Sequence, residues 1–268
     1  MDYERILLTG AAGRLGNVLR KSLAPLARNL RLADASPIST QFGQEEIVTF
    51  DLADMKATLA ACEGCDAIVH FGAVAMESSW QTILDSNIRG TYHIFEGARM
   101  HGARRVVYAS SVHAVGYYKI EDQIGLDAPV RPDSLYGVSK TFGESLSRLY
   151  WDKFGLESVC LRMFSSFSKP RNRRMLWSYL SFEDCARLTE AALTAPRVGH
   201  TISYGLSDNK TKVVDNSGAN HLGYTARDTA EPWREELEAN TPVPDLRAPA
   251  DKHLGGWFCD IGHPDDPD

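Results

Sequence analysis

Short apolar runs alternate with amphipathic stretches through the first 200 residues of the chain. A continuous apolar run is typical of a strand buried on both faces, and the longer stretches have helical spacing. Alternating strands and helices predict an α/β fold with a doubly wound parallel sheet. We expect strands at 5–9, 30–34, 47–50, 67–71, 105–109 and 158–163, and helices at 15–27, 55–62, 80–101 and 135–154.

Two further signals mark helix ends. Gly155 follows the last of these helices and suits the left-handed conformation that ends many helices. Ser181 begins another helix, with Asp184 at the spacing of a capping box. Beyond residue 199 the pattern weakens to a short helix at 233–239 and a loop at 241–251. We therefore expect a main domain of residues 1–200 and a small C-terminal lobe of residues 201–268, with residues 164–180 contributing to a pocket.

Composition excludes several classes of protein. The 268 residues are 43% hydrophobic and 24% charged, values that do not suit a disordered chain. The formal net charge of −6 argues against a nucleic-acid partner, and no apolar run is long enough to cross a membrane. The first residues are acidic where a signal peptide would be basic, so we expect no targeting segment.

The five cysteines are odd in number and scattered along the chain. This pattern argues against structural disulfides and favours a reducing, cytoplasmic location. Cys62 and Cys65 have the spacing of a metal or redox pair, but no second Cys or His pair lies near them in the sequence. We therefore expect no metal site.

Three glycines, Gly10, Gly13 and Gly16, lie between the first expected strand and the first expected helix. In this position glycines let the backbone approach a pyrophosphate, and the helix N-terminus presents free N–H groups and a positive dipole. The strand–turn–helix unit predicts a Rossmann-type dinucleotide site. Arg14 and Leu15, which begin the helix, are expected to lie against the cofactor.

Asp34 ends the second expected strand. A carboxylate in this position accepts hydrogen bonds from both hydroxyls of an adenosine ribose, and it repels a 2′-phosphate. The expected cofactor is therefore NAD rather than NADP. Further cofactor contacts are expected after the third and fourth strands, from Asp51, Leu52, Phe71, Gly72 and Ala73.

Tyr136 and Lys140 lie four residues apart on an expected helix, so they share one face. A free phenol has a pKa of about 10 and is a poor base at neutral pH. A neighbouring ammonium favours the phenolate, which can take a proton from an alcohol. Ser111, at the end of the fifth expected strand, is placed to hold the substrate oxygen beside Tyr136. Together these residues predict an NAD-dependent alcohol dehydrogenation.

The chain resembles the extended short-chain dehydrogenase/reductases in its glycine motif, Asp34, Ser111, Tyr136 and Lys140, taken in that order. The resemblance covers about residues 4–195. It implies that Ser111, Tyr136 and Lys140 are catalytic, with Lys140 also holding the nicotinamide ribose. It further implies that Asn87 is the family's structural asparagine, which helps to build a proton relay.

A narrower resemblance, to the bacterial uronate dehydrogenases, extends over nearly the whole chain. Those enzymes oxidise C1 of a hexuronate pyranose to an aldonolactone with NAD. The resemblance implies the same reaction here, on a small-molecule sugar acid. It rests on the segments 52–54, 64–70, 109–111, 115–118, 131–140 and 215–216, and on the pair Gly255-Gly256.

This resemblance also implies substrate contacts. Ser165 and Arg174 match positions that contact the substrate, and Arg174 can hold a carboxylate by a bidentate pair. His113 matches a position in the pocket. Ala75 and Val112 are expected to line the pocket too, although the family has Ser and Asn at these positions.

A third departure from the family pattern is Phe164, where the family has Gly. Each departure removes or reshapes polar contacts to a sugar. Because buried polar pairings discriminate strongly between substrates, the reaction class is better supported than the identity of the sugar.

Several alternatives stay open at this point. The substrate can be another hydroxy acid or sugar. The chain can also be a sugar epimerase or dehydratase that retains NAD, although such relatives usually have a larger C-terminal lobe. A catalytically silent NAD-sensing protein would be expected to have lost Tyr136 or Lys140. By analogy with the family, we expect a homo-oligomer that assembles through the helices at 80–101 and 135–154.

Overall fold

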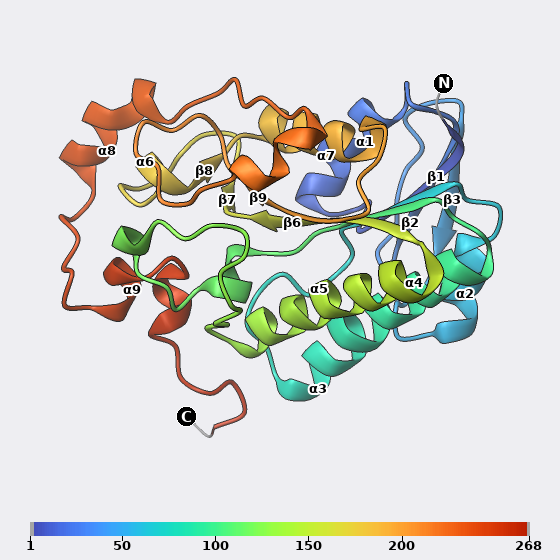
Figure 1. Ribbon diagram of the computed structural model, residues 1–268, viewed down its shortest axis with the longest axis horizontal. Helices are drawn as coiled ribbons and strands as arrows, with labels where there is room; N and C mark the ends of the chain where they lie inside the picture. The colour runs from blue at the N-terminus through green and yellow to red at the C-terminus, as the bar shows by residue number, and fades with distance from the viewer. Residues whose placement is uncertain (1–2, 267–268) are drawn as a thin grey trace.

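The computed structural model describes residues 3–266, which form a seven-stranded sheet with helices packed on both faces (Figure 1). The strand order is β3-β2-β1-β4-β5-β6-β9, and every neighbouring pair runs parallel. This confirms the doubly wound parallel sheet. The strands are β1 (Tyr3–Thr9), β2 (Ala27–Asp34), β3 (Glu45–Thr49), β4 (Ala67–His70), β5 (Arg105–Tyr108), β6 (Glu157–Met163) and β9 (His200–Gly205).

The winding of the sheet reverses between β1 and β4. β2 and β3 lie on one side of β1, and the strands from β4 onward lie on the other. Connections that diverge in this way open a crevice at the carboxyl ends of the two central strands. Thr9 of β1 and His70 of β4 are paired in register at these ends, so the glycine turn after β1 lies at the crevice.

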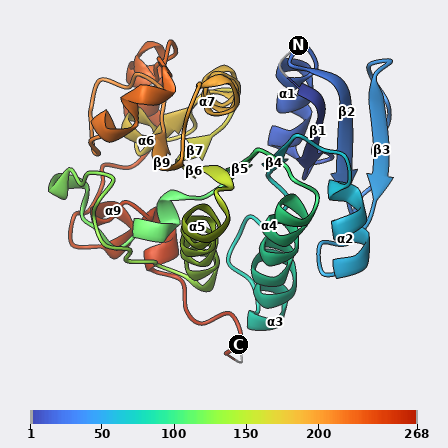
Figure 2. The same cartoon turned by 45° about the vertical axis from the view of Figure 1, so that its right-hand side comes forward.

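Helices form a layer on each face of the sheet (Figure 2). On one face α1 (Arg14–Leu23) packs against α7 (Phe182–Thr194). On the other, α2 (Met55–Cys62), α4 (Gly90–Met100) and α5 (Leu135–Phe154) pack side by side. The shorter segments are α3 (Trp80–Thr82), η1 (Ile83–Arg89, π-helical), η2 (Val112–Val115), η3 (Ile120–Asp122), α6 (Met175–Ser178), η4 (Ser217–Leu222), η5 (Glu231–Trp233), α8 (Arg234–Asn240), α9 (Pro249–Lys252) and η6 (Gly256–Cys259).

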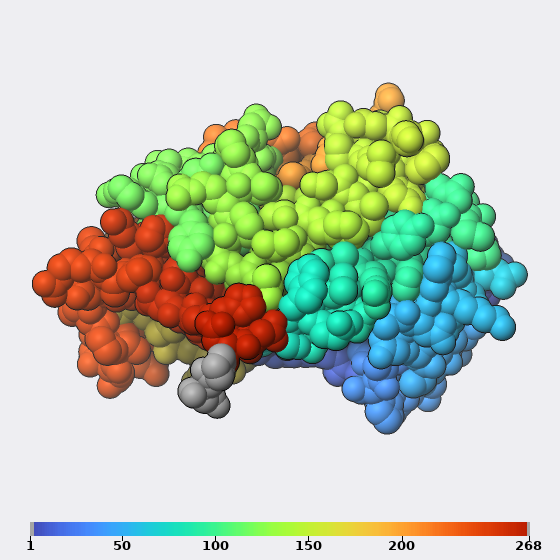
Figure 3. Space-filling model, turned by 90° about the horizontal axis from the view of Figure 1, so that it is seen from below, coloured from blue at the N-terminus to red at the C-terminus, as the bar shows by residue number. Residues whose placement is uncertain are grey.

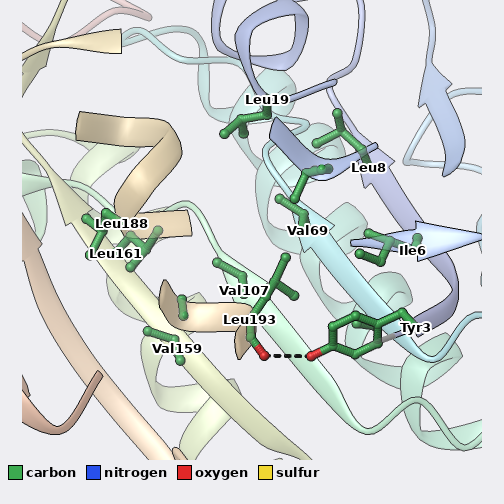
Figure 4. Packing of buried hydrophobic residues seen from close by; sticks show 14 of the residues in the cluster. Tyr3, Ile6, Leu8, Leu19, Val69, Val107, Val159, Leu161, Leu188 and Leu193 are labelled. Atoms are coloured by element: carbon green, nitrogen blue, oxygen red, sulfur yellow. Dashed lines mark hydrogen bonds between the residues drawn. The ribbon is translucent and has the colours of Figure 1, made fainter. Parts of the chain in front are cut away.

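Apolar side chains fill the space between the sheet and each helix layer. Under α1 and α7, residues such as Leu8, Val69 and Leu188 are fully buried (Figure 4). The Tyr3 hydroxyl donates to the carbonyl of Leu193 at 2.6 Å and links β1 to the end of α7. The central strands are apolar on both faces, which explains their continuous apolar runs in the sequence.

The helix expected at 80–101 is a composite. α3 and α4 are joined by the π-helical segment η1, and the run ends at Met100. Gly90 begins α4 and packs closely against Leu52, which precedes α2. A Cβ added at Gly90 would lie 2.7 Å from Leu52 Cβ. Asn87 lies within η1 and is 1% exposed. π-Helical turns are frequent at functional sites, and this one carries the asparagine that the sequence singled out.

Two other expected helix ends can be compared with the structure. The helix expected at 15–27 ends at Leu23, because Ala27 already pairs with Tyr3 as the first residue of β2. Gly155 ends α5 with a left-handed φ of 69°, as expected.

The capping box at the start of α7 is formed only in part. The Ser181 hydroxyl accepts from the amide of Asp184 at 2.8 Å, as expected. The Asp184 carboxylate does not return to Ser181 but accepts from the amides of Arg227 and Asp228, at 2.9 and 3.0 Å. Asp184 therefore links α7 to a distant loop.

The weak pattern beyond residue 199 conceals one strand. β9 pairs with β6 at the edge of the sheet, so the sheet extends past residue 200, where the expected division between two domains falls. Most of the later chain forms a lobe at the left of Figure 1. The segment 164–180 contributes a small parallel sheet of its own, made by β7 (Ser165–Ser166) and β8 (Tyr179–Leu180).

A buried ion pair joins α5 to the sheet. Glu144 of α5 accepts two hydrogen bonds from the Arg162 guanidinium of β6, at 2.9 and 2.8 Å. The Ser110 hydroxyl, just after β5, donates to the same carboxylate at 2.6 Å. The two charged side chains are 5% and 2% exposed. Because Glu144 lies one turn after Lys140, this network sets the position of the candidate catalytic helix over β5 and β6.

We expect Arg162→Met to lower the free energy of unfolding by about 3–5 kcal/mol, because it leaves the buried Glu144 carboxylate without its partner. The measurement is urea denaturation. Arg148→Met is the matched control, since Arg148 pairs with Asp152 on the exposed side of α5. We expect it to change stability by no more than about 0.5 kcal/mol. Equal losses in both variants would contradict the role of the buried pair.

Candidate active site

One cavity of about 500 Å³ opens along the carboxyl ends of the central strands. Every position that we expected to bind the cofactor lines it. The lining includes the glycine turn, Asp34, Asp51, the loop that begins at Phe71, and the pair Tyr136 and Lys140. The fold therefore brings together segments that are far apart in the sequence.

Glycine is required at two points of the turn after β1. Gly10 has a φ of +71°, and a Cβ at Gly16 would lie 2.1 Å from the Gly10 carbonyl oxygen. Gly13 is the N-cap residue of α1 and supplies no side-chain cap. The first turn of this helix carries no acidic residue. The first-turn amides of α1 have no capping acceptor there, so they can donate to an anion such as a pyrophosphate.

Asp34 is held against this turn. Its Oδ2 accepts from the amide of Ala12 at 3.0 Å, and its Oδ1 accepts from the amide of Ser36 at 2.9 Å. Each carboxylate oxygen has a second lone pair, which leaves acceptors for two ribose hydroxyls. The glycine cradle, the uncapped helix and this carboxylate together fit NAD.

Tyr136 and Lys140 share the buried face of α5, as their spacing predicted. Lys140 Nζ donates to the carbonyl of Ala109 at 2.8 Å and lies 5.3 Å from the centre of the Tyr136 ring. Ser111 follows β5 by three residues, and its hydroxyl lies on the side of Tyr136. The structure thus brings the three residues together at one end of the cavity.

Burial controls the proton affinities of this pair. It raises the pKa of Tyr136 to about 12, while the Ser111 hydroxyl acts in the opposite direction and the charge of Asp133 adds to the rise. Burial also lowers the pKa of Lys140 to about 7. The expected stabilisation of the phenolate by Lys140 concerns the site with cofactor bound, whereas without cofactor the pKa of Tyr136 lies above its ordinary value. Desolvation outweighs the attraction, so the phenolate needs a further positive charge beside it.

Asn87 holds the loop after β4 against α5. Its Oδ1 accepts from the amide of Val74 at 2.8 Å, and its Nδ2 donates to the carbonyl of Val74 at 2.9 Å. The same Nδ2 donates to Ser139 Oγ of α5 at 3.1 Å. Both ends of the side-chain amide are thus bound by protein groups. The part expected for Asn87 in a proton relay stays a prediction.

Glu77 is a site residue that the sequence analysis missed. Its carboxylate accepts from the amides of Leu135 and Tyr136, at 2.9 and 2.7 Å, and so caps the first turn of α5. An acidic group at a helix N-terminus is favourable for the helix dipole. A lone glutamate in a loop carries no motif, so only the tertiary structure reveals this contact.

The Arg174 guanidinium has no carboxylate in ion-pair contact among residues 3–266. It donates to Ser165 Oγ at 2.7 Å, to Ser178 Oγ at 3.2 Å and to the Leu254 carbonyl at 2.5 Å. Its Nε is buried and makes no hydrogen bond within the described residues. Burial lowers the pKa of Arg174 to about 10. The residue as a whole is half-buried, and the charge of Asp133 acts against the effect of burial. A guanidinium without a carboxylate in direct contact favours the binding of an anion.

The C-terminal segment forms a wall beside these residues. Phe258 stacks on the His113 ring with a centroid distance of 3.8 Å and lies 6.1 Å from the Tyr136 ring. The His113 ring is 5.6 Å from the Tyr136 ring, edge to face. A Cβ at Gly256 would lie 2.8 Å from Arg174 Nε. Sequence reasoning missed Phe258, and the pair at 255–256 was the available signal for this wall.

Two of the three family departures lie in an apolar cluster. Val112 and Phe164 are 3% and 7% exposed and pack in the same cluster, away from the cavity lining. Phe164 packs edge to face against Trp177 and Tyr204. Ala75 is exposed and lines the cavity, as expected. Val112 is not among the residues that line the cavity, and neither are Ser111, His113, Ser165 and Arg174. The expected contact of Val112 with the substrate stays a prediction.

Residues 3–266 hold no group of three or more His, Cys, Asp or Glu side chains arranged for a metal ion. Burial raises the pKa of Cys62 to about 12 and that of Cys65 to about 11, so both thiols stay protonated. No helix in the same part of the chain has the length and apolarity to span a membrane.

A family model, the NAD dependent epimerase/dehydratase family, matches residues 6–182. The chain belongs to this family. It is 47% identical over 261 residues to a uronate dehydrogenase from Pseudomonas putida, with 97% of each chain covered. The segment matched by the family model includes Tyr136 and Lys140.

Solved structures of similar proteins match nearly the whole chain. A glucuronic acid dehydrogenase from Chromohalobacter salexigens is 43% identical, with a TM-score of 0.96 and coverage of 99% of this chain and 100% of that one. A tyrosine-to-alanine mutant of the Agrobacterium tumefaciens uronate dehydrogenase in complex with NAD is 45% identical, with a TM-score of 0.93 and coverage of 97% and 98%.

We expect the Tyr136 phenol to stay protonated up to alkaline pH in the protein without cofactor, because burial disfavours the phenolate. The measurement is the ultraviolet difference spectrum between the wild type and Tyr136→Phe during a pH titration. Saturating NAD⁺ should move this ionisation to lower pH, and Lys140→Met should reduce the movement. An ionisation of Tyr136 near neutral pH without NAD⁺ would contradict the dominance of desolvation.

Proposed function

We propose that this protein oxidises C1 of a hexuronate to the aldonolactone with NAD⁺. The observation that carries the proposal is Arg174, a half-buried guanidinium with no carboxylate in ion-pair contact among residues 3–266, beside a wall that also contacts Tyr136. The similarity to uronate dehydrogenases over 97% of the chain supports the same reaction. Because the carboxylate of a uronate is a permanent anion at neutral pH, it is the counterion that Arg174 lacks.

The proposed chemistry assigns one task to each residue. Ser111 holds the C1 oxygen, and Tyr136 takes the hydroxyl proton as the C–O bond becomes a carbonyl. Lys140 is held beside the phenol by its contact with the Ala109 carbonyl, and in its protonated form it favours the phenolate. NAD⁺, when bound, accepts the hydride that leaves C1 and brings a positive ring to the site. The glycine turn and Asp34 would hold the cofactor.

Substrate recognition is proposed to use His113 and residues from the second half of the chain. Ser165 lies 2.7 Å from Arg174 and can share the carboxylate with it. His113 lies between Tyr136 and Phe258, where it can contact a sugar hydroxyl. We propose that the substrate lobe begins after β9 and that residues 164–180 belong to it, since Arg174 donates to Leu254 of the late segment.

We further propose that the protein forms a homo-oligomer through α4 and α5. Figure 3 shows these helices side by side across one face of the molecule. Their outer surface carries large exposed apolar side chains, which is unusual for a surface without a partner. These side chains are Tyr92, Met100, Val138, Leu149 and Phe154. The buried, unpaired thiols also support the proposed cytoplasmic location.

The assay for the proposed function is NADH formation from NAD⁺ with a panel of substrates. The panel holds D-glucuronate, D-galacturonate, their neutral hexoses and smaller hydroxy acids. We expect rapid turnover of the uronates and weak or no turnover of the hexoses. Turnover of another panel member, without turnover of uronates, would show that the pocket serves a different substrate.

We expect Arg174→Lys to lower kcat/KM for D-glucuronate by about 10- to 100-fold, mainly through KM, because lysine cannot form the bidentate pair. Turnover of neutral hexoses should change little. Arg171→Lys is the matched control, since Arg171 is exposed in the same segment and stacks on Phe167. An unchanged KM in Arg174→Lys would place carboxylate recognition elsewhere.

For self-association, we expect sedimentation velocity to give a mass above that of the monomer. Leu149→Glu, which places a charge in the exposed apolar surface of α5, should shift the protein towards the monomer. A wild type that sediments as a monomer at micromolar concentration would contradict the proposed oligomer.

A further inference from the structure

Asp133 carries a buried carboxylate to which the proposed chemistry assigns no task. Its side chain has no exposed surface, and its Oδ2 lies 2.7 Å from His113 Nδ1. Its Oδ1 accepts from the Ser134 hydroxyl at 2.7 Å. Asp133 thus lies directly behind a ring that contacts Tyr136 and Phe258.

The backbone is shaped to admit this carboxylate. A Cβ at Gly116 or at Gly255 would lie 1.8 Å from Asp133 Oδ2. These two glycines come from distant parts of the chain and are joined by a hydrogen bond from the Gly255 amide to the Gly116 carbonyl, at 2.9 Å. Any side chain at either position would displace the carboxylate from His113. The close packing leaves Asp133 one place in which to bind the imidazole.

The hydrogen bonds of Asp133 determine the proton position on His113. An ionised carboxylate only accepts hydrogen bonds, so His113 Nδ1 must carry a proton. In a neutral imidazole the other nitrogen, Nε2, is then an acceptor. Nε2 has no hydrogen-bond partner among residues 3–266, whereas Nδ1 is bound. The stack on Phe258 fixes the plane of the ring.

We propose that Asp133 is a positioning residue that holds His113 with its proton on Nδ1, so that Nε2 accepts a hydrogen bond from a substrate hydroxyl. This inference rests on the proposed function for the identity of the substrate. It deepens that function, because an acceptor at Nε2 selects a hydroxyl at one ring position of the sugar acid. Arg174 would bind the carboxylate of the substrate, and His113, positioned by Asp133, would bind one of its hydroxyls.

The first test is direct observation of the His113 tautomer by nitrogen-15 NMR of protein labelled in histidine. The His113 signals are assigned by comparison with His113→Asn. We expect a protonated Nδ1 and an unprotonated Nε2 at pH 8. In Asp133→Asn the Ser134 hydroxyl favours the amide oxygen at the Oδ1 position, so the amide nitrogen faces Nδ1 and the tautomer should reverse.

The second test is a double-mutant cycle on kcat/KM for D-glucuronate. His113→Asn keeps an amide donor for Asp133 but removes Nε2, so we expect a loss of about 10- to 100-fold. Asp133→Asn should lose about as much, and the double variant should lose little more than either. Asp152→Asn, in the exposed pair with Arg148, is the matched control and should keep wild-type kinetics.

Monodeoxy analogues of D-glucuronate identify the hydroxyl. The wild type should lose activity with one analogue, and Asp133→Asn should no longer distinguish that analogue from the parent sugar. NADH affinity and thermal unfolding, measured on each variant, report whether the protein is folded. His113→Asn retains Asp133 and its packing, so it remains informative if Asp133→Asn does not fold.

The outcomes separate this inference from the proposed function. A wild-type His113 with its proton on Nε2, or with both nitrogens protonated at pH 8, would overturn the inference whatever the substrate. Additive losses in the double variant would overturn it as well. A wild type that has the expected tautomer but does not oxidise uronates would refute the proposed function and leave the positioning role of Asp133 supported.

Discussion

The buried ion pair between Glu144 and Arg162 is the interaction on which the rest of the site depends. It fixes α5 to the sheet, and through Ser110 it also fixes the end of β5. Lys140 and Tyr136 lie on the same face of α5, one and two turns before Glu144. A buried pair gives little net stability, but its geometry is strict, because each charge must keep its partner. Strict geometry at this position holds a phenol and an ammonium beside the cofactor cavity.

The cofactor half and the proposed substrate half of the site are built differently. The cofactor half uses backbone: an uncapped helix N-terminus and a glycine turn in which a Cβ has no room. The proposed substrate half uses side chains that the protein holds in place, with Arg174 bound to the Leu254 carbonyl and His113 bound to Asp133. Both halves meet at Tyr136, whose pKa burial raises to about 12, so that its phenol stays protonated at neutral pH without added positive charge.

Most of the cofactor half was predictable from the sequence because its parts are local. Gly10 and Gly16 belong to one strand–turn–helix unit, and Tyr136 and Lys140 to one turn of helix, so their spacing reports their geometry. The substrate half was predictable only where a family resemblance supplied positions. Phe258 belongs to no sequence motif. It reaches the site because the C-terminal segment that contains it packs beside Tyr136 of α5.

The sequence by itself determined the parallel sheet, the glycine turn and the candidate catalytic residues, since apolar runs and helical spacing act over a few residues. Only the tertiary structure decided which groups surround them. It placed Glu77 on the first turn of α5, inserted Asp133 between two distant glycines, and moved Val112 into an apolar cluster. It also decided the proton affinities, because the pKa of Lys140 depends on burial, and burial depends on elements from every part of the chain.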